Sequence, residues 1–142
     1  MRRYLVVANR TLGGAALAAF VKERVASEPC VFHIVVPAAR PKGDAVWTEG
    51  EARDVARRRL DTAQRWFEDS GAQVTGEVGD QQPLLAIGDA LIAQPFDEIV
   101  LSTLPAGASR WLKVDLPARV RRAYGIPVTH VVADENDIRR TA

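Results

Sequence analysis

Short polar stretches follow several apolar segments of the sequence, and they contain the side chains best suited to bind a ligand. Asn9-Arg10-Thr11 follows the first apolar segment, and residues 102–110 include Ser102, Thr103, Gly107, Ser109 and Arg110. Amide and hydroxyl groups form hydrogen bonds with sugar and phosphate oxygens, and a guanidinium group binds an anion through paired N–H donors. Gly107, Ser109, Arg110 and Lys113 are therefore a candidate anion cradle.

The usual catalytic motifs are absent. The sequence has no GxSxG elbow, no GxxxxGK[ST] loop, no GxGxxG after the first apolar segment and no His/Cys/Asp cluster at metal spacing. These absences remove the main support for a generic α/β-hydrolase or a Rossmann dehydrogenase, and we expect no catalytic residue, no bound metal and no required cofactor. Nucleotide hydrolysis or transfer remains as a third reading, after the binding readings given below.

Several conspicuous residues have a plain structural reading. We expect His33 and His130 to be buried strand residues, Cys30 to be inert packing, and Trp111 to pack against the core rather than stack on a ligand. Arg57-Arg58-Arg59 is read as a solvated helix face, and Asp115 as the N-cap of a helix that runs to Tyr124. Asn9 is open to two readings, a turn residue or a ligand contact.

These residues must be positioned by alternating strands and helices. Apolar segments 4–8, 31–36, 74–78, 96–101 and 127–132 predict strands, and helical periodicity follows Gly14, Thr48, Gln82 and Asp115. Thr48 and Glu51 stand at capping-box spacing, and residues 37–47 and 102–109 are predicted loops. The pattern predicts an α/β fold with three layers: a doubly wound parallel sheet of five strands and about four helices, whose ligand crevice lies beyond the carboxyl ends of the strands.

Composition narrows the class of protein further. The 142 residues carry a net charge of +1 with both signs interspersed, so we expect no nucleic-acid and no membrane partner. One cysteine and no apolar run of about 20 residues indicate a cytoplasmic protein. We expect one domain over residues 1–133 and a charged, mobile tail over residues 134–142.

The order of motifs resembles the universal stress protein family over nearly the whole chain. The resemblance rests on Asn9-x-Thr11, Phe32-His33-Ile34-Val35, Gly79-Asp80-x-x-Pro83, Ile99-Val100-Leu101-Ser102-Thr103, and Ala118-Arg119-Val120 before Ile126-Pro127-Val128. It implies a five-stranded doubly wound sheet, a cytoplasmic homodimer and, in one subgroup, an ATP site. Carried over to this sequence, the nucleotide-binding residues are Asn9, Thr11, Ile34, Ser102, Thr103, Gly107, Ser109 and Arg110.

The phosphate loop departs from the pattern of the ATP-binding subgroup. That pattern, G-x-x-G, nine residues, then G-[ST], is replaced here by Ser102, by Pro105 or Ala106, and by Val114-Asp115. The leading interpretation is therefore a non-catalytic binding or regulatory module whose ATP site is degenerate or retuned. The alternative is a stress protein that binds ATP or AMP through a non-standard loop.

The resemblance also implies how two copies would associate. It places the fifth strand at the edge of the sheet, with Val128, Val131 and Val132 available to pair with a second copy. Isologous antiparallel pairing would close that edge and limit the assembly to a homodimer.

Overall fold

Five parallel strands form the centre of the molecule, as the sequence predicts. In the computed structural model, which describes residues 1–39 and 48–134, the strand order is β3-β2-β1-β4-β5. The strands are β1 (Arg2–Val7), β2 (Cys30–Pro37), β3 (Gln73–Gly79), β4 (Glu98–Thr103) and β5 (Val128–Val132). The order reverses between β1 and β4, where a doubly wound sheet opens its crevice.

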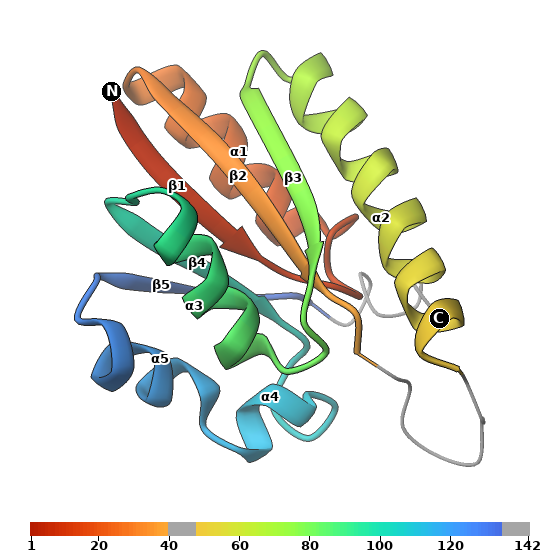
Figure 1. Cartoon of the computed structure of the whole chain (residues 1–142). Helices are drawn as coiled ribbons and strands as arrows, with labels where there is room; N and C mark the ends of the chain where they lie inside the picture. Colours follow the sequence, from red (N-terminus) through yellow and green to blue (C-terminus); the bar gives the residue numbers. More distant parts are fainter. Residues whose placement is uncertain (40–47, 135–142) are drawn as a thin grey trace.

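Helices cover both faces of the sheet (Figure 1). They are α1 (Ala15–Ser27), α2 (Glu49–Asp69), α3 (Pro83–Ala93), α4 (Arg110–Lys113) and α5 (Leu116–Tyr124). The first two pack on one face, and α3 and α5 pack on the other. The sequence predicts about four helices; the fifth is α4, a single turn that periodicity is too short to indicate.

The strand β1 contributes to two separate cores. Tyr4, Val6 and Ala8 face the core beneath α1 and α2, whereas Leu5 and Val7 face the core beneath α3 and α5. All five side chains are at most 1% exposed. Burial on both faces explains why this strand is a continuous apolar run without alternation.

Strand β4 extends further than the sequence suggests. Ser102 and Thr103, predicted to begin a loop, end β4 and are each 2% exposed. Their hydroxyl groups are paired inside the fold, with the Thr11 hydroxyl and the His130 imidazole respectively, each at 2.7 Å. Polar residues therefore continue the strand because partners are available in the core.

The helix α2 begins as its sequence predicts. The Thr48 hydroxyl accepts a hydrogen bond from the Glu51 amide at 3.0 Å. Most of the predicted loop 37–47 and all of the predicted tail after Asp134 lie outside the described residues.

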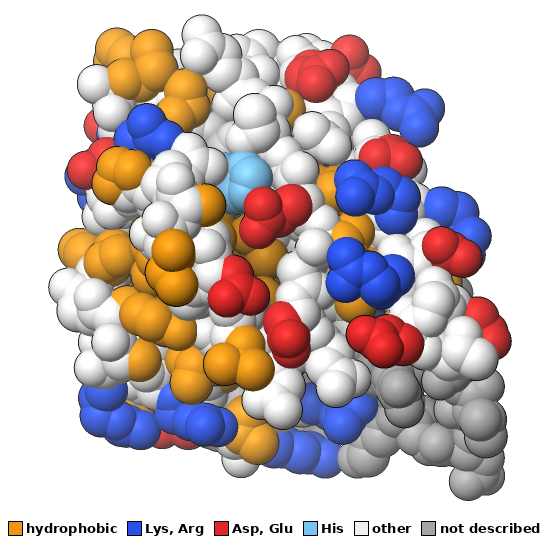
Figure 2. Space-filling model, viewed as in Figure 1, with side chains coloured by type: hydrophobic (Ala, Val, Ile, Leu, Met, Phe, Trp, Pro, Cys, Tyr) orange, Lys and Arg blue, Asp and Glu red, His pale blue; other side chains and the backbone are white. Residues whose placement is uncertain are grey.

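The surface over α3 is unusually apolar (Figure 2). Leu85 is 51% exposed and Ile92 is 87% exposed, and they lie on one side of this helix. Among the described helices, none is long and apolar enough to cross a membrane.

Candidate ligand-binding cleft

Asn9 joins three elements at the carboxyl edge of the sheet. Its side-chain amide donates to the Pro37 carbonyl at 2.7 Å, which connects the end of β1 to the end of β2. Its side-chain oxygen accepts a hydrogen bond from the Arg59 guanidinium of α2. Asn9 is thus half-buried and fixed in orientation. A residue that served only to form a turn would not need these two side-chain hydrogen bonds.

Three of the predicted nucleotide contacts face the interior instead of the crevice. Thr11 is 3% exposed and shares its hydrogen bond with Ser102. Thr103 pairs with His130. A buried hydroxyl that is already paired offers little to an incoming ligand.

Ile34 lies inside the sheet. It is fully buried in β2 and has Val6 of β1 and Gly76 of β3 as its register partners. The strand continues for three more residues to Pro37, so the backbone of Ile34 lies below the carboxyl edge. The structure thus places this member of the nucleotide-binding set implied by the resemblance in the interior of the sheet.

The loop after β4 is organised around Ser109 and two left-handed residues. The Ser109 hydroxyl accepts from the Leu112 amide at 3.2 Å and caps α4. Gly107 has a φ of 92°, a conformation that favours glycine, and Asp115 has a φ of 54°. Arg110 opens α4 with an exposed side chain.

The prediction that Asp115 caps α5 through its side chain is wrong. Asp115 does precede the helix, but its carboxylate makes no cap hydrogen bond. A capping side chain normally belongs to a residue in extended conformation, whereas Asp115 is left-handed, so its carboxylate is not aimed at the first amides.

A cleft lies between α1 and α2, at the carboxyl edge beside Asn9. Its volume is about 410 Å³, within the range of small-molecule sites. It is lined by Asn9, Arg10, Leu12, Gly13, Gly14, Ala18, Arg58, Arg59, Thr62, Ala63 and Trp66. Asn9 is the one member of the expected nucleotide-binding set among these lining residues.

The electrostatic character of the cleft is strongly positive. Arg10, Arg58 and Arg59 line it, and no Asp or Glu of the described residues does. Burial lowers the pKa of the Arg59 guanidinium, and the charges of Arg10 and Arg58 lower it further. Within the described parts of the chain, no carboxylate lies within ion-pair distance of these three side chains.

The start of α1 lies at the same cleft. Gly14 is the N-cap of this helix, and the first turn holds no acidic residue. The helix dipole favours negative charge beside a helix start. The guanidinium groups and this dipole together favour an anion.

The described lining of the cleft is poor in acid, base and nucleophile side chains. Of its lining residues, Thr62 alone carries a hydroxyl group, and none is a His, Cys, Asp or Glu. The described residues hold no group of three or more such side chains that could bind a metal ion. The two histidines occupy other places: His33 contacts Thr75 and Glu77, and His130 pairs with Thr103.

Sequence reasoning missed the arginines of this cleft. Arg57 and Arg58 are exposed as expected, but Arg59 is half-buried, so the reading of residues 57–59 as one solvated face is wrong for Arg59. The signal was present, since Ala56, Arg59, Ala63 and Trp66 follow the i, i+3, i+4 spacing of one helix face.

Known proteins share the fold of this chain at low sequence identity. No family model and no curated protein sequence matches it. Among solved structures, a universal stress protein from Archaeoglobus fulgidus has a TM-score of 0.59 and 13% identity, with 92% of this chain and 93% of that chain covered. A protein from the universal stress protein family from Burkholderia pseudomallei also has a TM-score of 0.59, with 18% identity and coverage of 90% and 93%.

These likenesses agree with the strand order and the two helical layers described above. Both structures align over more than nine tenths of their length, so the whole domain is compared and not a shared βαβ unit. The chain therefore has the fold of the universal stress proteins.

Proposed function

We propose that the protein is a non-catalytic module that binds a small anionic ligand in the cleft between α1 and α2 and acts through that binding. The observation that carries the proposal is the lining of the cleft, in which three arginines stand without an acidic residue among the described liners. A concave site with convergent donors and no acid, base or nucleophile supports binding over turnover.

The proposal includes weak binding of ATP at the loop after β4. Val114 and Asp115 stand where the ATP-binding pattern has a glycine and a hydroxyl residue, and Asp115 brings a negative charge. The hydroxyl of Ser109 is engaged in capping α4. Loss of several amide contacts to phosphate should lower the affinity for ATP by roughly two decades or more.

Calorimetry with Mg-ATP tests that part of the proposal. We expect no saturable binding at low micromolar concentration. A dissociation constant in that range would show that the loop holds nucleotide despite its sequence, and the non-standard nucleotide-binding reading would then replace ours.

The ligand site itself is tested by closing the cleft. Thr62 is exposed and lines the cleft, so Thr62→Trp should fill it without disturbing the core. Thr62→Ser is the matched control, because it leaves the space open. The parent protein and both variants are incubated with a small-molecule extract of cells, desalted, denatured and analysed by mass spectrometry.

We expect the parent and Thr62→Ser proteins to retain the same anionic compound and Thr62→Trp to lose it. Retention of that compound by all three proteins would place the site elsewhere. A compound that emerges chemically altered from the parent alone would contradict the non-catalytic part of the proposal.

A further inference from the structure

The cleft changes character along its length. Both helices that form it start at the carboxyl edge of the sheet, α1 after β1 and α2 after β2, so they run in the same direction (Figure 1). On α2, Arg58 and Arg59 come first, and Trp66 follows about two turns later, roughly 10 Å along the helix. On α1, Gly14 comes first and Ala18 follows one turn later. The cationic end therefore lies at the sheet edge, and the apolar end lies further along the two helices.

The cationic end provides more positive charge than a single carboxylate would balance. Arg10 and Arg58 are exposed, Arg59 is half-buried, and Asn9 holds the Arg59 guanidinium in place. The planar guanidinium group binds the oxygens of a phosphate through two parallel N–H donors. A doubly charged phosphate group matches three such side chains better than a singly charged acid does.

The apolar end provides room for an organic group. Ala18, Ala63 and Trp66 line it, and Ala63 belongs to the core beneath α1 and α2. The Lys22 ammonium lies 5.7 Å from the centre of the Trp66 ring. The volume of about 410 Å³ exceeds what a phosphate ion alone fills.

We propose that the ligand of this cleft is a phosphate monoester that carries an apolar or aromatic group. The phosphate binds between Arg10, Arg58 and Arg59, and the organic group lies against Ala18, Ala63 and Trp66. This inference rests on the function proposed above and specifies the chemical class of its ligand. No bond is made or broken in the process.

Three probes separate the contributions of the two ends. Phenyl phosphate has the dianion and the ring, inorganic phosphate has the dianion alone, and benzoate has the ring with a single charge. We expect phenyl phosphate to bind at least about tenfold more tightly than either of the others, because each of them lacks one group that the cleft can contact. Calorimetry at fixed ionic strength gives the three affinities.

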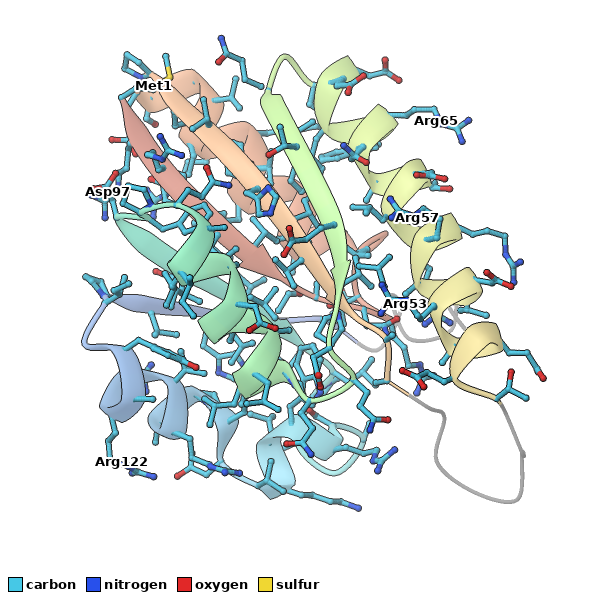
Figure 3. All side chains as sticks on the ribbon, viewed as in Figure 1. Met1, Arg53, Arg57, Arg65, Asp97 and Arg122 are labelled. Atoms are coloured by element: carbon cyan, nitrogen blue, oxygen red, sulfur yellow. The ribbon has the colours of Figure 1, made fainter. Side chains whose placement is uncertain are left out.

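Two variants assign those contributions to residues. Arg58→Gln should weaken phenyl phosphate about tenfold, as expected for loss of a charge-assisted contact. Arg57→Gln is the control, since Arg57 neighbours Arg58 on α2 but extends along the exposed side of the helix and does not line the cleft (Figure 3). Trp66→Leu should reduce the advantage of phenyl phosphate over inorganic phosphate while leaving inorganic phosphate itself unchanged.

Several outcomes would overturn this assignment. Equal affinities for phenyl phosphate and benzoate would exclude a phosphate site but leave the proposed anion-binding function standing. Equal weakening by Arg57→Gln and Arg58→Gln would show a general charge effect and no defined site. Absence of binding by all three probes, together with no compound retained from the extract, would remove both proposals.

Discussion

Asp115 and Ser109 show that position in the sequence does not by itself make a helix cap. Ser109 is 4% exposed, and its hydroxyl accepts a hydrogen bond from the Leu112 amide. Asp115 is exposed, has a left-handed backbone conformation and makes no cap hydrogen bond. A side chain stabilises a helix start only when its oxygen reaches a free amide. The two residues should therefore respond differently to substitution.

We expect Asp115→Gly to leave the free energy of unfolding unchanged or to raise it by up to about 1 kcal/mol, because glycine accepts a positive φ without steric cost. Ser109→Ala should lower it by about 0.5–2 kcal/mol through loss of a cap. Urea denaturation measures both values. A clear loss of stability in Asp115→Gly would show that the carboxylate contributes in solution.

His130 is expected to make the stability of the protein depend on pH. Burial lowers the pKa of its imidazole, and the positive charge of Arg121 lowers it further. The unfolded chain then takes up a proton first as the pH falls below about 6.5. The contribution of His130 is fully present above that pH and is lost as the pH falls towards the lower pKa of the folded state.

Melting temperatures at about pH 7.5 and pH 5.5 test this dependence on either side of the ordinary histidine pKa. The parent should lose more stability on acidification than His130→Gln, in which that group does not titrate. Both proteins contain His33, so the comparison isolates position 130. An equal loss in both would show that His130 has no part in it.

At the scale of residues, sequence patterns located the polar edge of the sheet but not the arrangement of its side chains. Asn9 was singled out correctly as a residue at that edge, yet its partners Pro37 and Arg59 are 28 and 50 residues away. Ser102 and Thr103 were assigned to the loop because polarity usually marks a strand end. In each case the environment of the side chain depends on hydrogen bonds with residues far away in the sequence. The spacing of residues along the chain does not reveal such partners.

Among the elements, α3 is held to α5 by a single polar contact next to a glycine. The Tyr124 hydroxyl donates to the Leu84 carbonyl at 2.6 Å, and a Cβ on Gly88 would lie 2.6 Å from that hydroxyl oxygen. The absence of a side chain at position 88 is therefore what admits Tyr124. Burial and the charge of Asp89 also raise the pKa of Tyr124, so the ring remains a neutral donor.

Gly88→Ala should lower the free energy of unfolding by about 1–2 kcal/mol, although alanine favours helix by about 1 kcal/mol. The alanine would displace the Tyr124 hydroxyl and break its hydrogen bond. Gly50→Ala is the control, because its nearest atom is 3.8 Å away and helix propensity alone acts there. It should be neutral or stabilising.

A double-mutant cycle identifies the cause of the loss. In a Tyr124→Phe background the offending oxygen is absent, so Gly88→Ala should cost much less than in the parent. An equal cost in both backgrounds would place the strain elsewhere in α3.

Strands and long helices were predictable because their patterns are local and repeated. Apolar runs that are mostly buried marked β1, β2 and β4, and valines at short spacing marked the partly exposed edge strands β3 and β5. Thr48 with Glu51 marked the start of α2. The short helix α4 has four residues. An amphipathic face becomes recognisable only over about two turns, roughly seven residues, so α4 is too short to show one. Its cap, Ser109, was instead assigned to a ligand.

For the whole molecule, the exposed edge of β5 predicts a homodimer. β5 lies at one end of the sheet, as the resemblance implied, and Val132 at its end is 44% exposed. The Ala133 amide donates inward to the Thr103 carbonyl. Because inward and outward groups alternate in a strand that has one neighbour, the Val132 amide points away from the sheet.

Sedimentation at micromolar concentration should give a dimer for the parent protein. Val132→Pro removes an outward amide without removing a bond to β4, so it should yield a folded monomer. Ala133→Ser is the control, since it leaves every backbone donor in place. A monomeric parent would contradict this interface, and a Val132→Pro protein that stays dimeric would assign the contact to another surface.

The arginines of the cleft have a kinetic consequence that the overall charge conceals. With a net charge of +1, the protein has almost no long-range attraction for an anion. The unbalanced field of Arg10, Arg58 and Arg59 extends only about 8 Å into physiological salt, the screening length there. Electrostatic attraction therefore accelerates the capture of an anion only after the anion has reached the mouth of the cleft. Ionic strength should change the rate of association at the cleft and should have little effect on encounters with the rest of the surface.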